Sequence, residues 1–116
     1  MSNYDPVTVF SVSADSDGAS NGIVPQTTNA TGVLIHKVVL RNATNSSNVI
    51  SVTMNDHPNI GSSATIIALS TNESGAVGTW ERYTSETFDP PVPFSRGVSL
   101  DLTGTNASVL VYYTRR

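Results

Sequence analysis

The sequence predicts an all-β protein, a single-domain β-sandwich or small barrel of about seven to eight mostly antiparallel strands, jelly-roll-like or immunoglobulin-like. Three observations support this prediction. Ser, Thr and Asn make up about a third of the 116 residues and valine is the leading aliphatic residue, and these types favour strands and the turns between them. Short stretches alternate apolar and polar residues, as strands do. No helical periodicity continues beyond two turns.

Length and composition favour one domain with one core. A chain of 116 residues suits a single domain, and a hydrophobic fraction of 38% is enough for one core. We expect residues 1–116 to form this domain, with an N-terminal arm over 1–6 and a long polar loop over 13–32. The chain has no cysteine, which excludes a disulfide framework and thiolate chemistry.

The alternation of apolar and polar residues places the strands. We expect them over 6–12, 33–42, 49–56, 64–70, 79–88, 97–104 and 107–114. The clearest strand has a predicted core face of Leu34, His36, Val38 and Leu40. The predicted apolar faces of the next strand and of the last are Ile50, Val52 and Met54, and Val109, Val111 and Tyr113. A polar turn separates 33–42 from 49–56, so these two strands are expected to pair as an antiparallel hairpin, and 64–70 is expected to be a short buried strand.

The stretch FDPPVPFSRGVSLDL, from Phe88 to Leu102, contains three prolines within four positions. Proline cannot donate a hydrogen bond to a sheet, so this stretch predicts a stiff corner between two strands. Phe88 and Phe94 are expected to pack into the core or into an interface on either side of the bend.

Charge excludes several classes of partner. The net charge is −3, only 13% of residues are charged, and Lys37 is the single lysine. We therefore expect neither a nucleic-acid stripe nor a polybasic membrane patch. The apolar runs are too short to span a bilayer, and the N-terminus MSNYDPVTVF does not resemble a signal peptide. These features predict a protein made in the cytoplasm, with no nucleic-acid or membrane partner.

Residues that could carry chemistry are few. His36 lies within a predicted strand and is interpreted as a core or interface histidine. His57 follows Asp56, and such a pair can orient an imidazole for base catalysis or begin a metal site, but no spacing supplies further ligands and loop chemistry is the favoured interpretation. Asp15 and Asp17 in DSDG resemble the start of a calcium loop, but the spacing of the remaining ligands does not follow.

The sequence leaves open whether His57 or the Asp15 and Asp17 pair binds a metal. It contains no nucleophile elbow and no glycine-rich phosphate loop. We therefore predict no catalytic residues, no cofactor and no enzymatic activity.

Two stretches, HKVVLRNATNSSNVISVTMND and FDPPVPFSRGVSLDLTGTNASVLVYYT, resemble small structural proteins of tailed bacteriophage virions, of the capsid decoration or cement type. The shared features are an aliphatic strand, N-x-(S/T) turns, a second strand ending in Asp, a Phe-x-x-Gly-(Val/Ile) segment and the closing pattern G-T-x-A-x-(V/L)-x-V-x-Y. The similarity covers residues 36–56 and 88–114.

This resemblance implies a non-enzymatic protein on the capsid surface that binds across major capsid subunits, or another virion protein, and stabilises the shell. It also implies a homo-oligomer, a dimer or trimer. Irregular segments that can order on a partner and aromatic residues, which are enriched at interfaces, give the candidate contact residues. These candidates are Tyr4, Pro6, Ile23, Val24, Trp80, Tyr83, Phe94, Tyr112 and Tyr113. The alternative is a carbohydrate- or receptor-binding module of a phage tail or fibre, with Trp80 or the tyrosines as a stacking platform.

Overall fold

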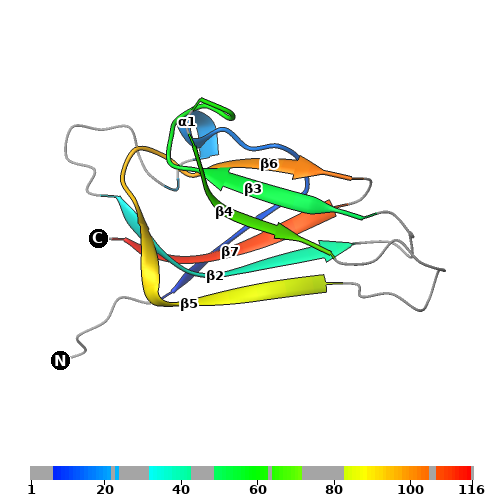
Figure 1. Cartoon of the computed structure of the whole chain (residues 1–116). Helices are drawn as coiled ribbons and strands as arrows, with labels where there is room; N and C mark the ends of the chain where they lie inside the picture. The colour runs from blue at the N-terminus through cyan, green and yellow to red at the C-terminus, as the bar shows by residue number, and fades with distance from the viewer. Residues whose placement is uncertain are drawn as a thin grey trace.

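The computed structural model describes residues 7–21, 23, 32–42, 49–62, 64–71, 83–104 and 107–115, and these form a β-sandwich with one short helix (Figure 1). The all-β prediction is confirmed. The elements are β1 (Thr8–Val12), α1 (Gly18–Asn21), β2 (Val33–Asn42), β3 (Ser51–Asn55), β4 (Thr65–Ser70), β5 (Tyr83–Phe94), β6 (Ser99–Thr103) and β7 (Ala107–Arg115).

The strands form a four-stranded sheet in the order β1-β7-β2-β5 and a three-stranded sheet in the order β4-β3-β6. Every pair is antiparallel. The expected hairpin of 33–42 with 49–56 is wrong, because β2 and β3 lie in different sheets. Alternation identifies the buried face of a strand but not its neighbour, and β2 pairs with β5 and β7 instead.

The core face of β2 changes side within the strand. Val38 and Leu40 are fully buried, as predicted, but in the first half of the strand Val33 and Ile35 are buried in place of Leu34 and His36. The register shifts between Ile35 and Lys37 against both neighbouring strands. An extra residue in one strand of a pair reverses the alternation beyond it, so the bulge at His36 explains why the predicted face is half wrong.

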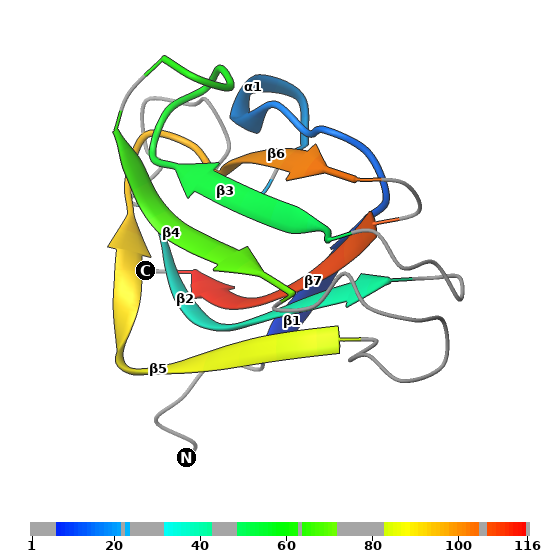
Figure 2. The ribbon, with the colours of Figure 1, turned by 45° about the vertical axis from the view of Figure 1, so that its right-hand side comes forward.

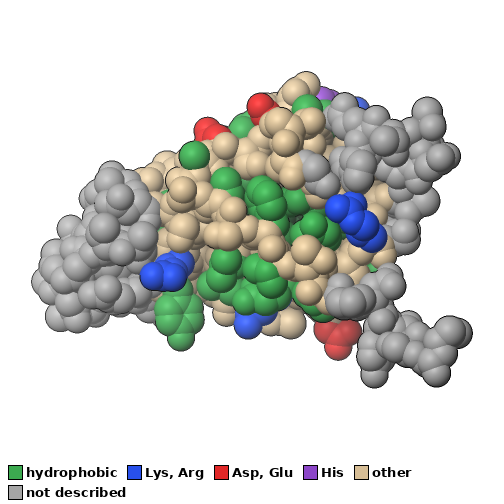
Figure 3. All heavy atoms as spheres, turned by 180° about the vertical axis from the view of Figure 1, so that it is seen from behind, with side chains coloured by type: hydrophobic (Ala, Val, Ile, Leu, Met, Phe, Trp, Pro, Cys, Tyr) green, Lys and Arg blue, Asp and Glu red, His purple; other side chains and the backbone are tan. Residues whose placement is uncertain are grey.

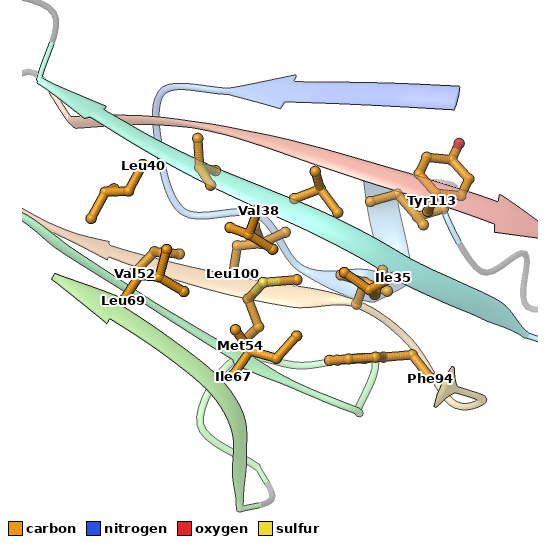
Figure 4. Packing of buried hydrophobic residues seen from close by; sticks show 14 of the residues in the cluster. Ile35, Val38, Leu40, Val52, Met54, Ile67, Leu69, Phe94, Leu100 and Tyr113 are labelled. Atoms are coloured by element: carbon orange, nitrogen blue, oxygen red, sulfur yellow. The ribbon is translucent and has the colours of Figure 1, made fainter. Parts of the chain in front are cut away.

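The core lies between the two sheets, and side chains from both point toward one another (Figure 4). Ile50, Val52 and Met54 are fully buried, and Val109, Val111 and Tyr113 are buried as well, so both predicted apolar faces are confirmed. In β4 only Ile67 and Leu69 are buried. β4 is therefore an amphipathic strand and not the fully buried strand that we expected.

The prolines lie inside one strand and not between two. β5 pairs with β2 before Pro90 and Pro91, through Tyr83–Thr87, and again after them through Val92–Phe94, a segment that includes Pro93. Figure 2 shows β5 bending sharply near its middle. Because β5 is an edge strand, prolines that donate no hydrogen bond are tolerated there. Phe94 is buried and Phe88 is half-buried against the core, so the corner was predicted correctly but its place in the topology was not.

The described part of the 13–32 loop is ordered by the opposite end of the chain. Ser16 pairs with Leu100 through two backbone hydrogen bonds of 2.9 Å, and the single-turn helix α1 follows. The expected irregular loop is therefore partly helical. Within the described ranges, no helix has the length and hydropathy needed to cross a membrane.

Candidate functional site

The Asp56 carboxylate holds a loop from the other end of the chain. It accepts hydrogen bonds from the backbone amides of Ser95 at 3.1 Å, Arg96 at 2.7 Å and Gly97 at 3.2 Å. The Ser95 hydroxyl contributes a further contact at 3.4 Å. Successive amides that converge on one carboxylate make a strong anchor, because bonds to a charged acceptor exceed neutral ones. The loop between β5 and β6 is therefore tied to the end of β3.

Ser99 and two glycines bring three segments together at the same end of the sandwich. The Ser99 hydroxyl donates to the His57 carbonyl at 2.6 Å and accepts from the Gly18 amide at 2.9 Å. A Cβ added at Gly97 would lie 2.6 Å from the His57 carbonyl oxygen, and one at Gly18 would lie 2.8 Å from it. Only glycine allows the backbones to approach this closely. We call the cluster of hydrogen bonds made by Asp56, Ser99 and their backbone partners the loop junction.

The aspartates of DSDG belong to the same junction. Asp15 Oδ1 accepts from the Leu102 amide at 2.8 Å, and Asp17 Oδ1 accepts from the Ile60 amide at 3.0 Å. Each carboxylate thus joins two segments far apart in the sequence. Among the described residues, no three His, Asp or Glu side chains gather in a way that could hold a metal ion. The two carboxylates therefore have a structural role, but it is to join distant segments and not to form the local turn that we expected.

The histidines also make structural contacts. His57 Nδ1 accepts from the Asn59 amide at 2.9 Å, within its own turn. The neighbouring Asp56 side chain bonds to the backbone of residues 95–97. Asp56 and His57, which are adjacent in the sequence, therefore bond to different segments and do not act as a pair. His36 Nε2 lies 2.8 Å from the Thr114 hydroxyl, which joins the β2 bulge to β7.

The junction yields a stability prediction. Asp56→Asn removes the charge and turns an amide group toward backbone donors, so we expect the free energy of unfolding to fall by about 2 kcal/mol. Urea denaturation followed by circular dichroism measures the change. Asp101→Asn is the matched control, because Asp101 is a half-buried carboxylate on β6 outside these hydrogen bonds, and it should have little effect. Equal midpoints for the two variants would contradict the anchoring role.

The predicted contact residues fall into three groups. Ile23 and Phe94 are buried at 1% and 0% exposure and Tyr113 at 7%, so their apolar area is used inside the chain and does not form a surface. Tyr83 is 63% exposed and Tyr112 is half-buried on the outside of the four-stranded sheet. The remaining candidates lie outside the described residues: Tyr4, Pro6, Val24 and Trp80.

The outward face of the four-stranded sheet carries an apolar patch. Cross-strand neighbours share a face, and the register places Val9 beside Tyr112 and Tyr112 beside Lys37. The next rows join Leu110 to Val39 and Arg41 to Tyr83. We call the set the outer patch: Val9, Lys37, Val39, Arg41, Tyr83, Leu110 and Tyr112.

None of the outer patch is fully buried, although most of it is apolar. Figure 3 shows this face, with apolar side chains gathered in its middle and Lys and Arg side chains toward the margin. Leu110 and Tyr112 alternate with the buried residues of β7, so this strand is apolar on both faces. Such a strand in the sequence is the signal from which the outer patch could have been predicted.

The charge on the outer patch is of one sign. Lys37 Nζ lies 5.8 Å from the centroid of the Tyr112 ring, within reach of a cation–π contact. Arg41 is exposed beside Tyr83. The positions paired with these cations in the described registers are Tyr112, Thr87, Ser108 and Tyr83, and none is a carboxylate. A chain of net charge −3 thus presents a locally cationic apolar surface.

The fold and this surface define a class: a small β-sandwich whose polar groups tie its loops together and whose larger sheet presents an apolar, cationic face. Comparison with protein-family models, with curated proteins and with solved structures finds no match for the chain.

Proposed function

We propose that this protein is a non-enzymatic structural component of a tailed-phage virion, a capsid decoration protein that binds across major capsid subunits and stabilises the shell. The observation that carries the proposal is the outer patch, a partly exposed and mostly apolar surface on the four-stranded sheet. Patches of this kind on soluble proteins mark interaction sites. The sequence resemblance adds the class of assembly.

The side chains that could act in catalysis already make hydrogen bonds within the chain, and this supports a binding role over an enzymatic one. Asp56, Asp15 and Asp17 accept backbone hydrogen bonds, and His57 and Ser99 take part in the same junction. Side chains used to hold loops are less available for proton transfer or nucleophilic attack. The junction thus has a structural explanation that needs no substrate.

The stabilising mechanism is linkage. A module that binds the assembled shell and not the dissociated subunits shifts the equilibrium toward the shell. The outer patch fits a partner surface with an apolar centre and acidic residues around it. The residues paired with Lys37 and Arg41 on the neighbouring strands are not carboxylates, so acidic groups of a partner can complement these two charges. Each contact can be weak, since many copies act on one closed particle.

Particles made with and without the gene test the proposal. Mass spectrometry of purified particles should find this chain at a copy number comparable to that of the major capsid protein. Particles that lack it should release their DNA at a lower temperature, and added protein should restore the wild-type temperature. A chain missing from the particles, or particles of unchanged thermal stability, would contradict a decoration role.

One observation favours the alternative of a carbohydrate- or receptor-binding module in a tail or fibre. Tyr83 is 63% exposed and Arg41 lies directly across the strand pair from it. An exposed aromatic ring beside a hydrogen-bond donor is a common platform for a sugar. A glycan array distinguishes the two functions, since a specific sugar that loses binding in Tyr83→Ala would favour the module.

A further inference from the structure

Two of the four sheet edges carry features that hinder the addition of another strand. β5 forms one edge of the four-stranded sheet and carries Pro90, Pro91 and Pro93, which cannot donate to an added strand. β6 forms an edge of the smaller sheet, but Ser16 pairs with Leu100 and Asp15 accepts from the Leu102 amide. The first half of β5, Tyr83–Phe88, has no proline but carries the exposed charge of Glu86, so neither edge is both unobstructed and uncharged along its whole length.

The other two edges differ in their surroundings. β4 lies against β5 at the side of the sandwich, where the bent half of β5 approaches it (Figure 2). β1 pairs only with β7, and no other described strand packs on its outer side. Of the edges that the described residues form, β1 is therefore the one open along its length.

The sequence of β1 lacks the features that protect an edge. Thr8–Val12 reads TVFSV, with no proline, glycine or charged residue. Natural edge strands commonly carry a lysine, a proline or a bulge to prevent pairing with other chains. Val7 and Val9 are 50% and 47% exposed at this edge. An open, uncharged and partly apolar edge is suited to addition of another strand.

Charge decides how two copies can meet. A face-to-face contact would bring Lys37 and Arg41 of both copies into one interface without carboxylates, and like charges there are unfavourable. Edge-to-edge pairing through β1 avoids this, because β7 separates β1 from the cations of β2. Five strand spacings would then separate the two β2 strands, about 24 Å, which is beyond the screening length of about 8 Å at physiological salt.

We propose that β1 is a self-association site, at which β1 of a second copy adds antiparallel to form one continuous eight-stranded sheet, built from two of the four-stranded sheets. A two-fold axis makes one edge complementary to itself. The two outer patches then lie on the same side of the joined sheet and form one wider surface. This inference goes beyond the proposed function and does not depend on it, because it concerns the protein alone.

Two matched variants test the site in the absence of any particle. Val9→Lys places a charge on the open edge, and Ile66→Lys places the same charge on β4 at a side chain of equal exposure, 50% against 47%. Sedimentation velocity up to about 200 µM suits the weak association expected of a small interface. Wild type and Ile66→Lys should approach twice the monomer mass of 12.3 kDa, while Val9→Lys should stay at the monomer mass.

Hydrogen exchange supplies an independent readout in the unmodified chain. Amides of β1 should exchange more slowly as protein concentration rises, by about tenfold between dilute and saturating protein, because pairing with a second strand buries them. Amides of β4 should not respond. A monomeric wild type at the highest concentration, a dimer that survives Val9→Lys, or equal loss in both lysine variants would each overturn the proposal.

These outcomes are separable from those of the proposed function. A monomeric wild type that still stabilises particles would overturn only the self-association site. A β1 dimer that is missing from particles would overturn only the decoration role.

Discussion

Phe94→Ala should lower the free energy of unfolding by about 3–5 kcal/mol, a large part of the stability of a domain of this size. The ring is fully buried and is one of the largest fully buried side chains in the core. It lies at one end of the displayed core residues (Figure 4), in the part of β5 that pairs with the start of β2. Truncation removes the apolar contact and leaves a cavity, which together cost about 3–5 kcal/mol. A domain of this size has only about 5–15 kcal/mol in total.

Tyr83→Ala is the matched control, because Tyr83 is an aromatic residue of the same strand with 63% of its surface exposed. We expect a change within about 0.5 kcal/mol for it. Calorimetry of both variants measures the difference. Comparable losses would mean that Phe94 does not lie in the core as described.

Arg41→Glu should reduce attachment to the shell by about tenfold or more. The substitution reverses the charge at the margin of the outer patch, and like charges placed across an interface cost several kcal/mol. Each 1.4 kcal/mol corresponds to about tenfold in affinity. The measurement is the fraction of protein that sediments with particles that lack their own copy. The prediction rests on the proposed function.

Arg96→Glu is the control for this effect. Arg96 is also exposed and undergoes the same change of charge, but it lies in the loop junction and not in the outer patch. It should attach like wild type. Raising the salt concentration should weaken wild-type attachment and should affect Arg41→Glu less. Equal attachment of both variants would show that the cationic margin does not face the shell.

The sequence was sufficient for the fold class and for most strand positions, because alternation and composition are local properties. It was not sufficient for strand neighbours. β2 and β3 are consecutive and separated by a polar turn, yet they belong to opposite sheets. The bulge at His36 was also missed, since a single extra residue changes the buried face without changing the apolar content of the strand.

The surface was harder to predict than the core. Aromatic type alone suggested Phe94 and Tyr113 as contact residues, but both are buried inside the chain. The outer patch depends on the register of β1, β7, β2 and β5, which brings together residues far apart in the sequence. The loop junction depends on the same kind of distant contact, as between Asp56 and Arg96. No local pattern encodes these pairings.

Cryo-electron microscopy of the particles is the most direct test of the proposed decoration role. We expect density for this β-sandwich on the outer shell, in contact with more than one major capsid subunit, with the outer patch turned toward the shell. Density confined to the tail or a fibre, no density for the chain, or a sandwich whose outer patch faces solvent would contradict it.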